Sequence, residues 1–173
     1  PVSVTKSSSL GYTRTHATEY HDNTAKWILG QVARVKCTAP ANALPEGCGA
    51  SGTMISEISY DSTHALVLTT KSFGKLQQIL AYDTTSTATS GQLGTVKTVK
   101  NGKSNITTLS SWKRGIPQSI KYPITSESPV GAIESAVVND SGWITSVTDE
   151  NGFTTGYAYD AMGRLASIVR PGG

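Results

Sequence analysis

The most constraining feature of this 173-residue sequence is a segment near its C-terminal end that occurs twice. The run Asn139–Val147 aligns with Asp160–Ile168 at a constant offset of 21 residues. Each copy begins with a polar turn residue and has a glycine three positions later. A strand-like run follows, in which Leu or Ile comes first and Val or Ile comes three positions later. A fixed period of about 20 residues is typical of stacked repeats, in which one unit cannot bury its apolar face without a neighbour. The last third of the chain therefore predicts a repeating architecture.

Each copy of the duplicated segment predicts a turn followed by a strand. Asp160 and Asn139 can accept a hydrogen bond from the backbone two residues on, and Gly163 and Gly142 permit the positive φ angle at which such a turn closes. The segment Asp149–Gly152 supplies a further turn between the two copies. The expected order is strand, turn, strand, turn and strand. The fold class that follows is all-β, an antiparallel β-meander of repeat units.

The second copy carries a longer motif, which reads Tyr157-Ala158-Tyr159-Asp160-Ala161-Met162-Gly163-Arg164-Leu165. The pattern Tyr-x-Tyr-Asp-x-x-Gly-Arg-Leu resembles the YD repeat of bacterial Rhs proteins, which is related to the repeats of toxin-complex shells and of teneurins. Degenerate matches precede it at Tyr20–Asp22, at Tyr60–Asp61 and within Phe73–Asp83. The residues assigned to the repeat motif are Tyr157, Tyr159, Asp160, Gly163, Arg164, Leu165, Gly142 and Trp143.

This resemblance implies that the chain is a curved sheet segment of a larger shell. In Rhs proteins, antiparallel sheets spiral into a hollow cocoon that encloses a C-terminal toxic domain. The implied role is non-catalytic containment in a secreted or cell-surface protein of bacterial competition, with flanking repeats of the parent polypeptide and its C-terminal toxin as partners. The family's C-terminal self-cleavage motif of Asp-Pro type is not matched by Arg170–Gly173, so autoproteolysis is not carried over. Open sheet edges predict self-association.

Composition agrees with thin β structure. Ser and Thr number 21 and 23, and only 37% of the residues are hydrophobic, which suits sheets with one wet face better than a thick core. We expect residues 1–173 to form one domain or fragment, with a loop at 38–47 and clear repeat units over 139–173. The abrupt start and end indicate a piece of a longer polypeptide.

Charge and hydropathy exclude several classes of partner. The net charge of +3 is scattered, with no run of basic residues that tracks a phosphate backbone, so no nucleic acid is expected. No stretch approaches the length of a membrane span. Residues 1–11 do not resemble a signal peptide, so export would be directed from outside this segment.

Cys37 and Cys48 enclose a Pro- and Gly-rich loop, which predicts a disulfide if the chain leaves the reducing cytosol. Two free thiols are the alternative. Two cysteines cannot hold zinc by themselves, and no histidine lies at the usual spacing from them. His16 and His21 are five residues apart, so on a strand they point to opposite faces and do not converge on a metal. We therefore expect no metal site and no cofactor.

A search for catalytic groups finds little. There is no Gly-x-Ser-x-Gly motif and no glycine-rich loop before a Lys-Ser or Lys-Thr pair. Glycosidases use a pair of carboxylates, and the chain offers four acids as candidates: Asp140, Asp149, Glu150 and Asp160. Most of them are better explained as turn residues. The chain is therefore not expected to be an enzyme.

Aromatic side chains are the stronger candidates for function. Trp112, Trp143, Tyr157 and Tyr159 either stack on sugar rings or pack across strands to join one repeat to the next, and packing is favoured because every repeat needs it. The alternative function is thus a cell-surface carbohydrate-binding module with contacts at Trp112, Trp143 and Tyr159.

Three local assignments depend on weaker patterns. Residues 23–36 fit a helix or a strand, and the repeat context favours a strand. The pair Asn101-Gly102 predicts a two-residue hairpin turn. Residues 112–117 alternate polar and apolar, which predicts a strand, and a Thr- and Ser-rich loop is expected at 83–90.

Overall fold

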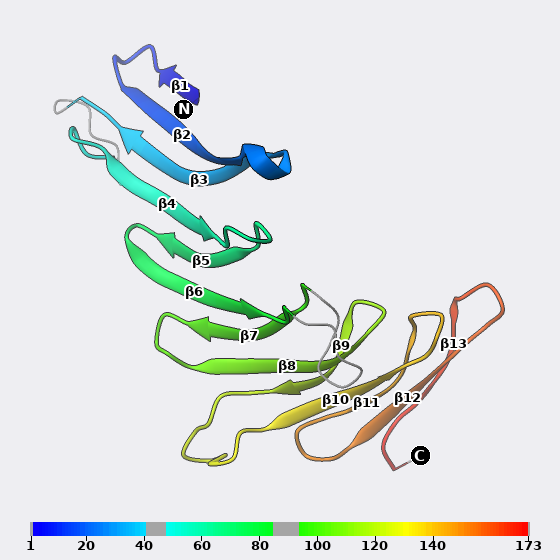
Figure 1. Ribbon diagram of the computed structural model, residues 1–173. Helices are drawn as coiled ribbons and strands as arrows, with labels where there is room; N and C mark the ends of the chain where they lie inside the picture. Colours follow the sequence, from blue (N-terminus) through cyan, green and yellow to red (C-terminus); the bar gives the residue numbers. More distant parts are fainter. Residues whose placement is uncertain (1, 41–47, 85–93, 173) are drawn as a thin grey trace. The chain divides into compact units, whose positions relative to one another are not determined.

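The computed structural model describes residues 2–40, 48–84 and 94–172. Within these residues the chain forms thirteen strands and one short 3-10 helix, and no α-helix occurs among them. The hydrogen-bonded order of the strands is their order in the chain, β1 to β13, as Figure 1 lets the reader follow. The expectation of an all-β antiparallel meander is confirmed. The parts of the loops expected at 38–47 and 83–90 that span 41–47 and 85–90 lie outside the described residues.

The chain divides into two compact units, the first of which is Pro1–Ile79. Its strands pair antiparallel in sequence, and the pairing of β2 with β3 is the longest, with eleven residues in each strand. The strands are β1 (Val2–Ser7), β2 (Thr13–Asn23), β3 (Ile28–Thr38), β4 (Thr53–Tyr60), β5 (Val67–Ser72) and β6 (Lys75–Tyr82), of which β6 extends past the unit boundary.

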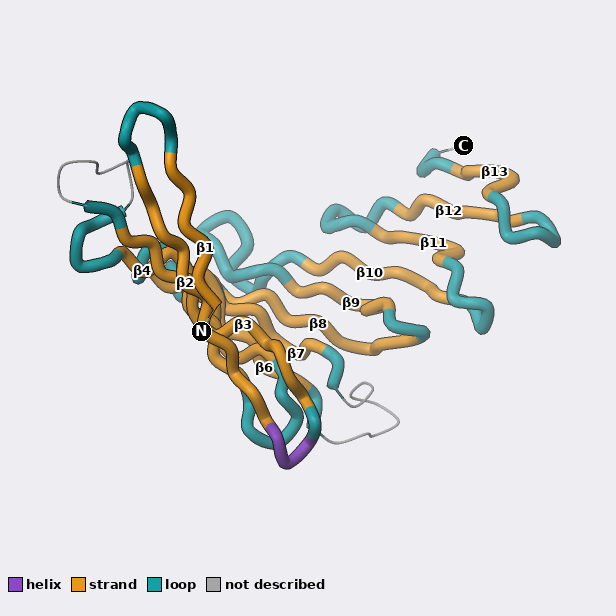
Figure 2. Tube along the Cα trace, turned by 90° about the horizontal axis from the view of Figure 1, so that it is seen from above, coloured by secondary structure: helices purple, strands orange, loops and turns teal. Residues whose placement is uncertain are grey.

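The second unit, Leu80–Gly173, contains the duplicated segment. Figure 2 shows its last strands following one another, with turns at alternate ends. Strands β11 and β13 lie at the 21-residue offset that the sequence predicts, since Ile144 corresponds to Leu165 and Thr148 to Val169. The strands are β7 (Val96–Asn101), β8 (Ile106–Lys113), β9 (Ile116–Lys121), β10 (Ile133–Val138), β11 (Ile144–Thr148), β12 (Thr154–Tyr159) and β13 (Leu165–Val169).

The ambiguous segment 23–36 is mostly strand. A single 3-10 turn, η1 (Thr24–Lys26), begins after Asn23, whose side chain accepts a hydrogen bond from the Lys26 amide, and ends at Trp27 in the left-handed region. Strand β3 follows directly. Gly30 has a φ of +78°, which an α-helix does not accommodate, so the strand interpretation is confirmed.

Two of the local predictions, a turn and a strand, are wrong in detail. The hairpin between β7 and β8 exists, but its positive φ falls at Ser104 rather than at Gly102, because the Asn101 side chain holds a longer turn. The strand expected over 112–117 is interrupted by Arg114 and Gly115, both at positive φ, which form the two-residue turn between β8 and β9.

Few side chains are fully buried. In the first unit, Cys37, Ala39 and Cys48 form the buried cluster, and Ile55 packs against it. Val138 is a buried hydrophobic residue of the second unit, at 2% exposure. Most other strand residues are half-buried, so the strands are held by cross-strand pairs and turns more than by a thick core.

Candidate functional site

The turn at Asp160 is the best-defined local structure of the duplicated segment. One carboxylate oxygen, Oδ1, accepts hydrogen bonds from the amides of Met162 and Arg164, both at 2.9 Å. The backbone closes around it: the Asp160 amide donates to the Arg164 carbonyl and the Gly163 amide to the Asp160 carbonyl. Gly163 supplies the positive φ of +79° at the fourth position. A single oxygen thereby satisfies two amides that would otherwise have no partner in the turn.

The same turn recurs along the second unit. In each case a side-chain oxygen accepts from the amides two and four positions on, at 2.9 to 3.0 Å. The acceptor is an amide oxygen at two positions and a carboxylate at the others, so acceptor geometry matters here more than charge. The acceptors are Asn101, Asn139, Asp149 and Asp160, with positive φ at Ser104, Gly142, Gly152 and Gly163 respectively.

Arg164 adds an ion pair to the Asp160 turn. Its Nε donates to the second carboxylate oxygen of Asp160 at 2.8 Å. The amide of Arg164, followed by its side chain, holds the pKa of the Asp160 carboxyl below its usual range. Asp160 is therefore ionised at neutral pH and accepts hydrogen bonds through both oxygens.

Trp143 and Tyr159 join the turns of the two copies. Their rings lie 5.2 Å apart at 35°, and the Tyr159 hydroxyl donates to the carbonyl of Ile144 at 2.8 Å. A Cβ added at Gly163 would lie 2.7 Å from Cζ2 of Trp143. The indole of the first copy thus rests directly on the backbone of the second copy's turn, and only glycine leaves room for it.

A related arrangement occurs at the degenerate match Tyr60–Asp61. The Tyr60 hydroxyl donates to the carbonyl of Val32 on the neighbouring strand at 2.8 Å, as Tyr159 does to Ile144. Asp61 accepts from the His64 amide, and this hydrogen bond lowers the pKa of its carboxyl. The aromatic residue therefore makes the same kind of hydrogen bond as in the clean copy of the motif, whereas the turn differs, because Asp61 accepts from the amide three positions on and the positive φ falls at Ala65.

Comparison with known families finds a similarity for this segment. Residues 138–173 match the RHS Repeat family, about a fifth of the chain. We call this segment the RHS repeat below, after the family that it is similar to. The matched residues include both turns with the Trp143–Tyr159 contact. No curated protein matches the chain.

Three solved structures have low-level similarity to the whole chain. They are the Photorhabdus luminescens Tc holotoxin pore with a TccC3 mutation (15% identity, TM-score 0.42), TcdB2-TccC3-TEV (16%, 0.46) and TcdB2-TccC3-Cdc42 (14%, 0.43). The alignments cover 96%, 98% and 96% of this chain. They cover 10% of each solved chain, so this chain spans about a tenth of their length.

The other residues assigned to the RHS repeat lie on one face. Tyr157 and Leu165 line a shallow apolar hollow together with Ile144, Val147 and Tyr159. Across β12 and β13, Tyr157 faces Ile168 and Tyr159 faces Leu165. The repeat therefore presents a continuous apolar strip, of which the side chain of Leu165 is 52% exposed.

The aromatic residues considered for sugar binding are engaged within the sheet. Trp112 donates from Nε1 to the carbonyl of Val96 at 3.1 Å, and Trp143 and Tyr159 contact one another. All three side chains are half-buried. A sugar-stacking platform needs an open ring face, so these contacts favour packing, and carbohydrate binding stays a prediction.

The four acids considered as a catalytic pair have separate positions. Asp149 and Asp160 hold the RHS-repeat turns, and Asp140 pairs with Lys113 at 2.9 Å, which lowers the pKa of the Asp140 carboxyl. Glu150 is exposed on the turn that Asp149 begins. A general acid needs a raised pKa. The shifts at Asp140 and Asp160 run in the opposite direction.

The cysteine region of the first unit brings together residues that are distant in the sequence. Cys37 and Cys48 form a disulfide, with their Cα atoms 5.2 Å apart. His16 on β2 faces Cys37 on β3, so its imidazole reaches the same place. His21 lies elsewhere, stacked on Tyr60 at 5.5 Å. The two histidines do not meet, but His16 joins the cysteines, which the sequence spacing did not reveal.

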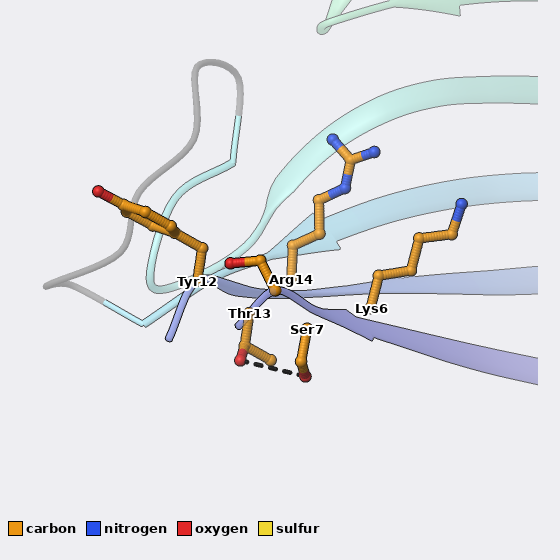
Figure 3. A pocket seen from close by; sticks show the side chains of 6 residues that line it. Lys6, Ser7, Tyr12, Thr13 and Arg14 are labelled. Atoms are coloured by element: carbon orange, nitrogen blue, oxygen red, sulfur yellow. Dashed lines mark hydrogen bonds between the residues drawn. The ribbon is translucent and has the colours of Figure 1, made fainter. Parts of the chain in front are cut away.

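A second hollow lies at the end of the β1–β2 hairpin (Figure 3). Lys6 and Arg14 face each other across the two strands, and Thr13 donates to Ser7 on the other side of the hairpin at 3.4 Å. Tyr12 closes the turn end. This hollow is open and its cations are exposed, so it presents a basic patch without a buried polar group to fix a ligand.

Among the described residues, no helix is long and apolar enough to span a membrane.

Proposed function

We propose that this chain is a non-catalytic structural segment of an Rhs-type shell and helps to enclose a C-terminal toxic domain. The observation that carries the proposal is the contact between repeat copies, in which Trp143 of one copy rests on Gly163 in the turn of the next. The distinctive residues of the RHS repeat therefore serve to join strands. Among the described residues of the repeat, they do not bring polar groups together as a catalytic site requires.

The outer strands support a place within a longer sheet. Among the described residues, β1 and β13 each have a hydrogen-bonded neighbour on one side only. Strand β13 holds no charged residue, and Leu165, Ile168 and Val169 are all at least half exposed. Natural edge strands are normally protected by charges, proline or bulges. The pairing of β12 with β13 shifts between Ala158 and Tyr159, so β13 carries an irregularity at that end, but it has neither charge nor proline. Such an edge suits pairing with a flanking repeat, or with a second copy of this chain.

The proposal also covers the partners of the chain and its location. Residues 1–173 act as one stretch of repeat-type wall, whose partners are the flanking repeats of the parent polypeptide and its C-terminal toxin. The parent is secreted or displayed at a bacterial surface and serves in competition between bacteria. Similarity of residues 138–173 to the RHS Repeat family supports these assignments.

Limited proteolysis of the longer polypeptide tests the enclosure. The wild-type polypeptide is expected to protect its C-terminal domain from an added protease. Trp143→Ala should increase cleavage of that domain, because it opens the contact between two wall strands. Met162→Ala is the matched control, since Met162 lies in the same turn with its side chain 79% exposed, and it should leave protection unchanged. Equal cleavage of the domain in all three proteins, at the rate of the isolated domain, would overturn the proposal.

A further inference from the structure

The cysteine region contains three side chains that can bind a metal, and the disulfide uses two of them. The imidazole of His16 and the sulfur atoms of Cys37 and Cys48 all lie within 4.8 Å of one another. Cys37 is fully buried and Cys48 is 8% exposed. Imidazole nitrogen and thiolate sulfur are the ligands that Zn²⁺ prefers in proteins. The three residues therefore form a candidate site once the sulfurs are free.

The second observation concerns the free nitrogen of the histidine. Nε2 of His16 is buried and has no hydrogen-bond partner among the described residues. A buried polar nitrogen without a partner costs free energy, so its position beside two sulfur atoms calls for a physical explanation. Coordination of a metal by Nε2 satisfies the atom, whereas a disulfide offers it only weak acceptors.

The backbone keeps Cys48 in place independently of the disulfide bond. Thr38 at the end of β3 bridges Gly49, and the Ala39 amide donates to the Gly49 carbonyl at 3.4 Å. The Gly49 amide in turn donates to Oγ1 of Thr53 at 2.9 Å. These contacts hold the residue after Cys48 against β3 and β4. Reduction therefore leaves the second sulfur near Cys37 and His16.

We propose that the reduced chain binds one Zn²⁺ through His16, Cys37 and Cys48, so that a metal replaces the disulfide in a reducing environment. A dithiol reductant supplies two electrons and two protons, the Cys37–Cys48 bond breaks to give two thiols, and the reductant becomes a disulfide. Zn²⁺ then displaces the two thiol protons into solvent, and the imidazole of His16 binds the ion through the lone pair of Nε2.

The geometry and charge of the cluster fit this exchange. In a tetrahedral zinc site with Zn–S bonds of about 2.3 Å, ligand sulfurs lie about 3.8 Å apart, which is within the 4.8 Å span of the cluster. Two thiolates neutralise the ion, which suits a site as buried as this one. Three protein ligands leave one position for water. The hollow lined by Val4, Lys6 and His16 adjoins the cluster on the β1 side.

Metal titration of the full chain tests the site. The reduced protein, kept anaerobic with a phosphine reductant, is titrated with Zn²⁺ against a chromogenic chelator and, in parallel, with Co²⁺. We expect one equivalent of Zn²⁺ to bind, with thiolate-to-cobalt charge-transfer and tetrahedral d–d bands in the Co²⁺ sample. The oxidised protein should bind none at the same metal concentration.

Two variants separate the site from non-specific binding by thiols. His16→Ala should weaken Zn²⁺ binding at least about tenfold and alter the Co²⁺ spectrum. His21→Ala, a histidine on the same strand, should bind as the wild type does. Zn²⁺ should also raise the thermal midpoint of the reduced wild type and of His21→Ala, and should raise that of His16→Ala by less.

Equal affinity in His16→Ala and wild type, or no binding by a reduced chain that keeps its β-sheet circular dichroism, would overturn the proposal. So would binding by the reduced chain together with loss of that circular dichroism, because the ligands would then come from an unfolded chain. The result does not depend on the shell role, which the proteolysis of the longer polypeptide tests separately.

Discussion

The RHS repeat and the cysteine region are ordered by contacts of different range. In the repeat, each turn is closed by a side chain that accepts from amides two and four residues away. In the cysteine region, a disulfide joins residues 11 positions apart, and His16 approaches from another strand. A unit that carries its own turn chemistry can be copied along a chain. A cluster assembled from separate strands depends on one particular register and is therefore a local specialisation of the first unit.

Loss of the disulfide should have the largest effect and should stay within the first unit. A cross-link that closes a loop of this length stabilises a folded protein by about 3 kcal/mol. Cys48→Ser should therefore lower the free energy of unfolding of the oxidised chain by about that amount. Amide exchange should rise in β3 and β4 and remain unchanged over residues 138–173.

Reductant provides the control for this variant, because it should destabilise the wild type in metal-free buffer and leave Cys48→Ser unaffected. Faster exchange throughout the RHS repeat in Cys48→Ser would contradict the separation of the two regions.

A matched pair of glycine substitutions tests the contact within the repeat. Gly152 and Gly163 occupy the same turn position at φ of +84° and +79°, but an added Cβ meets nothing within 4 Å at Gly152 and lies 2.7 Å from Trp143 at Gly163. Gly152→Ala should cost about 1 kcal/mol, from the left-handed backbone alone. Gly163→Ala should cost about 2–3 kcal/mol, because the indole must also move.

Denaturant unfolding followed by tryptophan fluorescence measures both variants. In the double background with Trp143→Ala, the two glycine substitutions should become equal in cost. If they already have the same cost in the wild-type background, Trp143 does not pack on the turn as described.

The smallest effect concerns the charge of Asp160. Its pKa is lowered in the folded chain, so the ionised carboxyl adds stability that is fully present above its unfolded pKa of about 3.9 and is lost as the pH falls through the folded value. Asp160→Asn keeps the Oδ1 acceptor, as Asn139 does, and should be nearly as stable at pH 7 but lose less stability below pH about 4. Asp160→Ala removes the acceptor and should be the less stable of the two at every pH.

This prediction is checked by measuring the thermal unfolding midpoints of the three proteins from pH 7 down to a pH below the unfolded pKa of about 3.9. Identical acid profiles for wild type and Asp160→Asn would show that the charge of the Asp160 carboxyl contributes nothing to stability. Equal stability of the Ala and Asn variants at pH 7 would show that the turn does not depend on its acceptor.

The sequence predicts the repeat well because everything that defines it lies within a few residues. Asp160, its two amide donors and Gly163 are contained in five consecutive positions, so the turn follows from residue types at fixed spacing. The same chemistry explains the error at Asn101-Gly102. The Asn101 side chain binds the amides of Lys103 and Asn105, and that moves the positive φ to Ser104.

The approach of His16 to Cys37 is not predictable in this way, because it depends on the register of β2 against β3. Counting back from the turn at Trp27 gives that register only if the strands are regular. The pairing shifts between Glu19 and Tyr20 and again between His21 and Asn23. Irregularities of this kind are set by packing across strands and leave no mark in the residue types of a single strand.

The central claim is that the aromatic residues of the repeat join strands rather than bind a ligand. The most direct test is a glycan panel and thermal unfolding, carried out side by side on the wild type, Trp143→Ala and Tyr159→Ala. The account predicts no saturable glycan binding by any of the three proteins and a lower unfolding midpoint for both variants. Saturable binding by the wild type that is lost in a variant with an unchanged unfolding midpoint would contradict it and would assign these residues to a carbohydrate site.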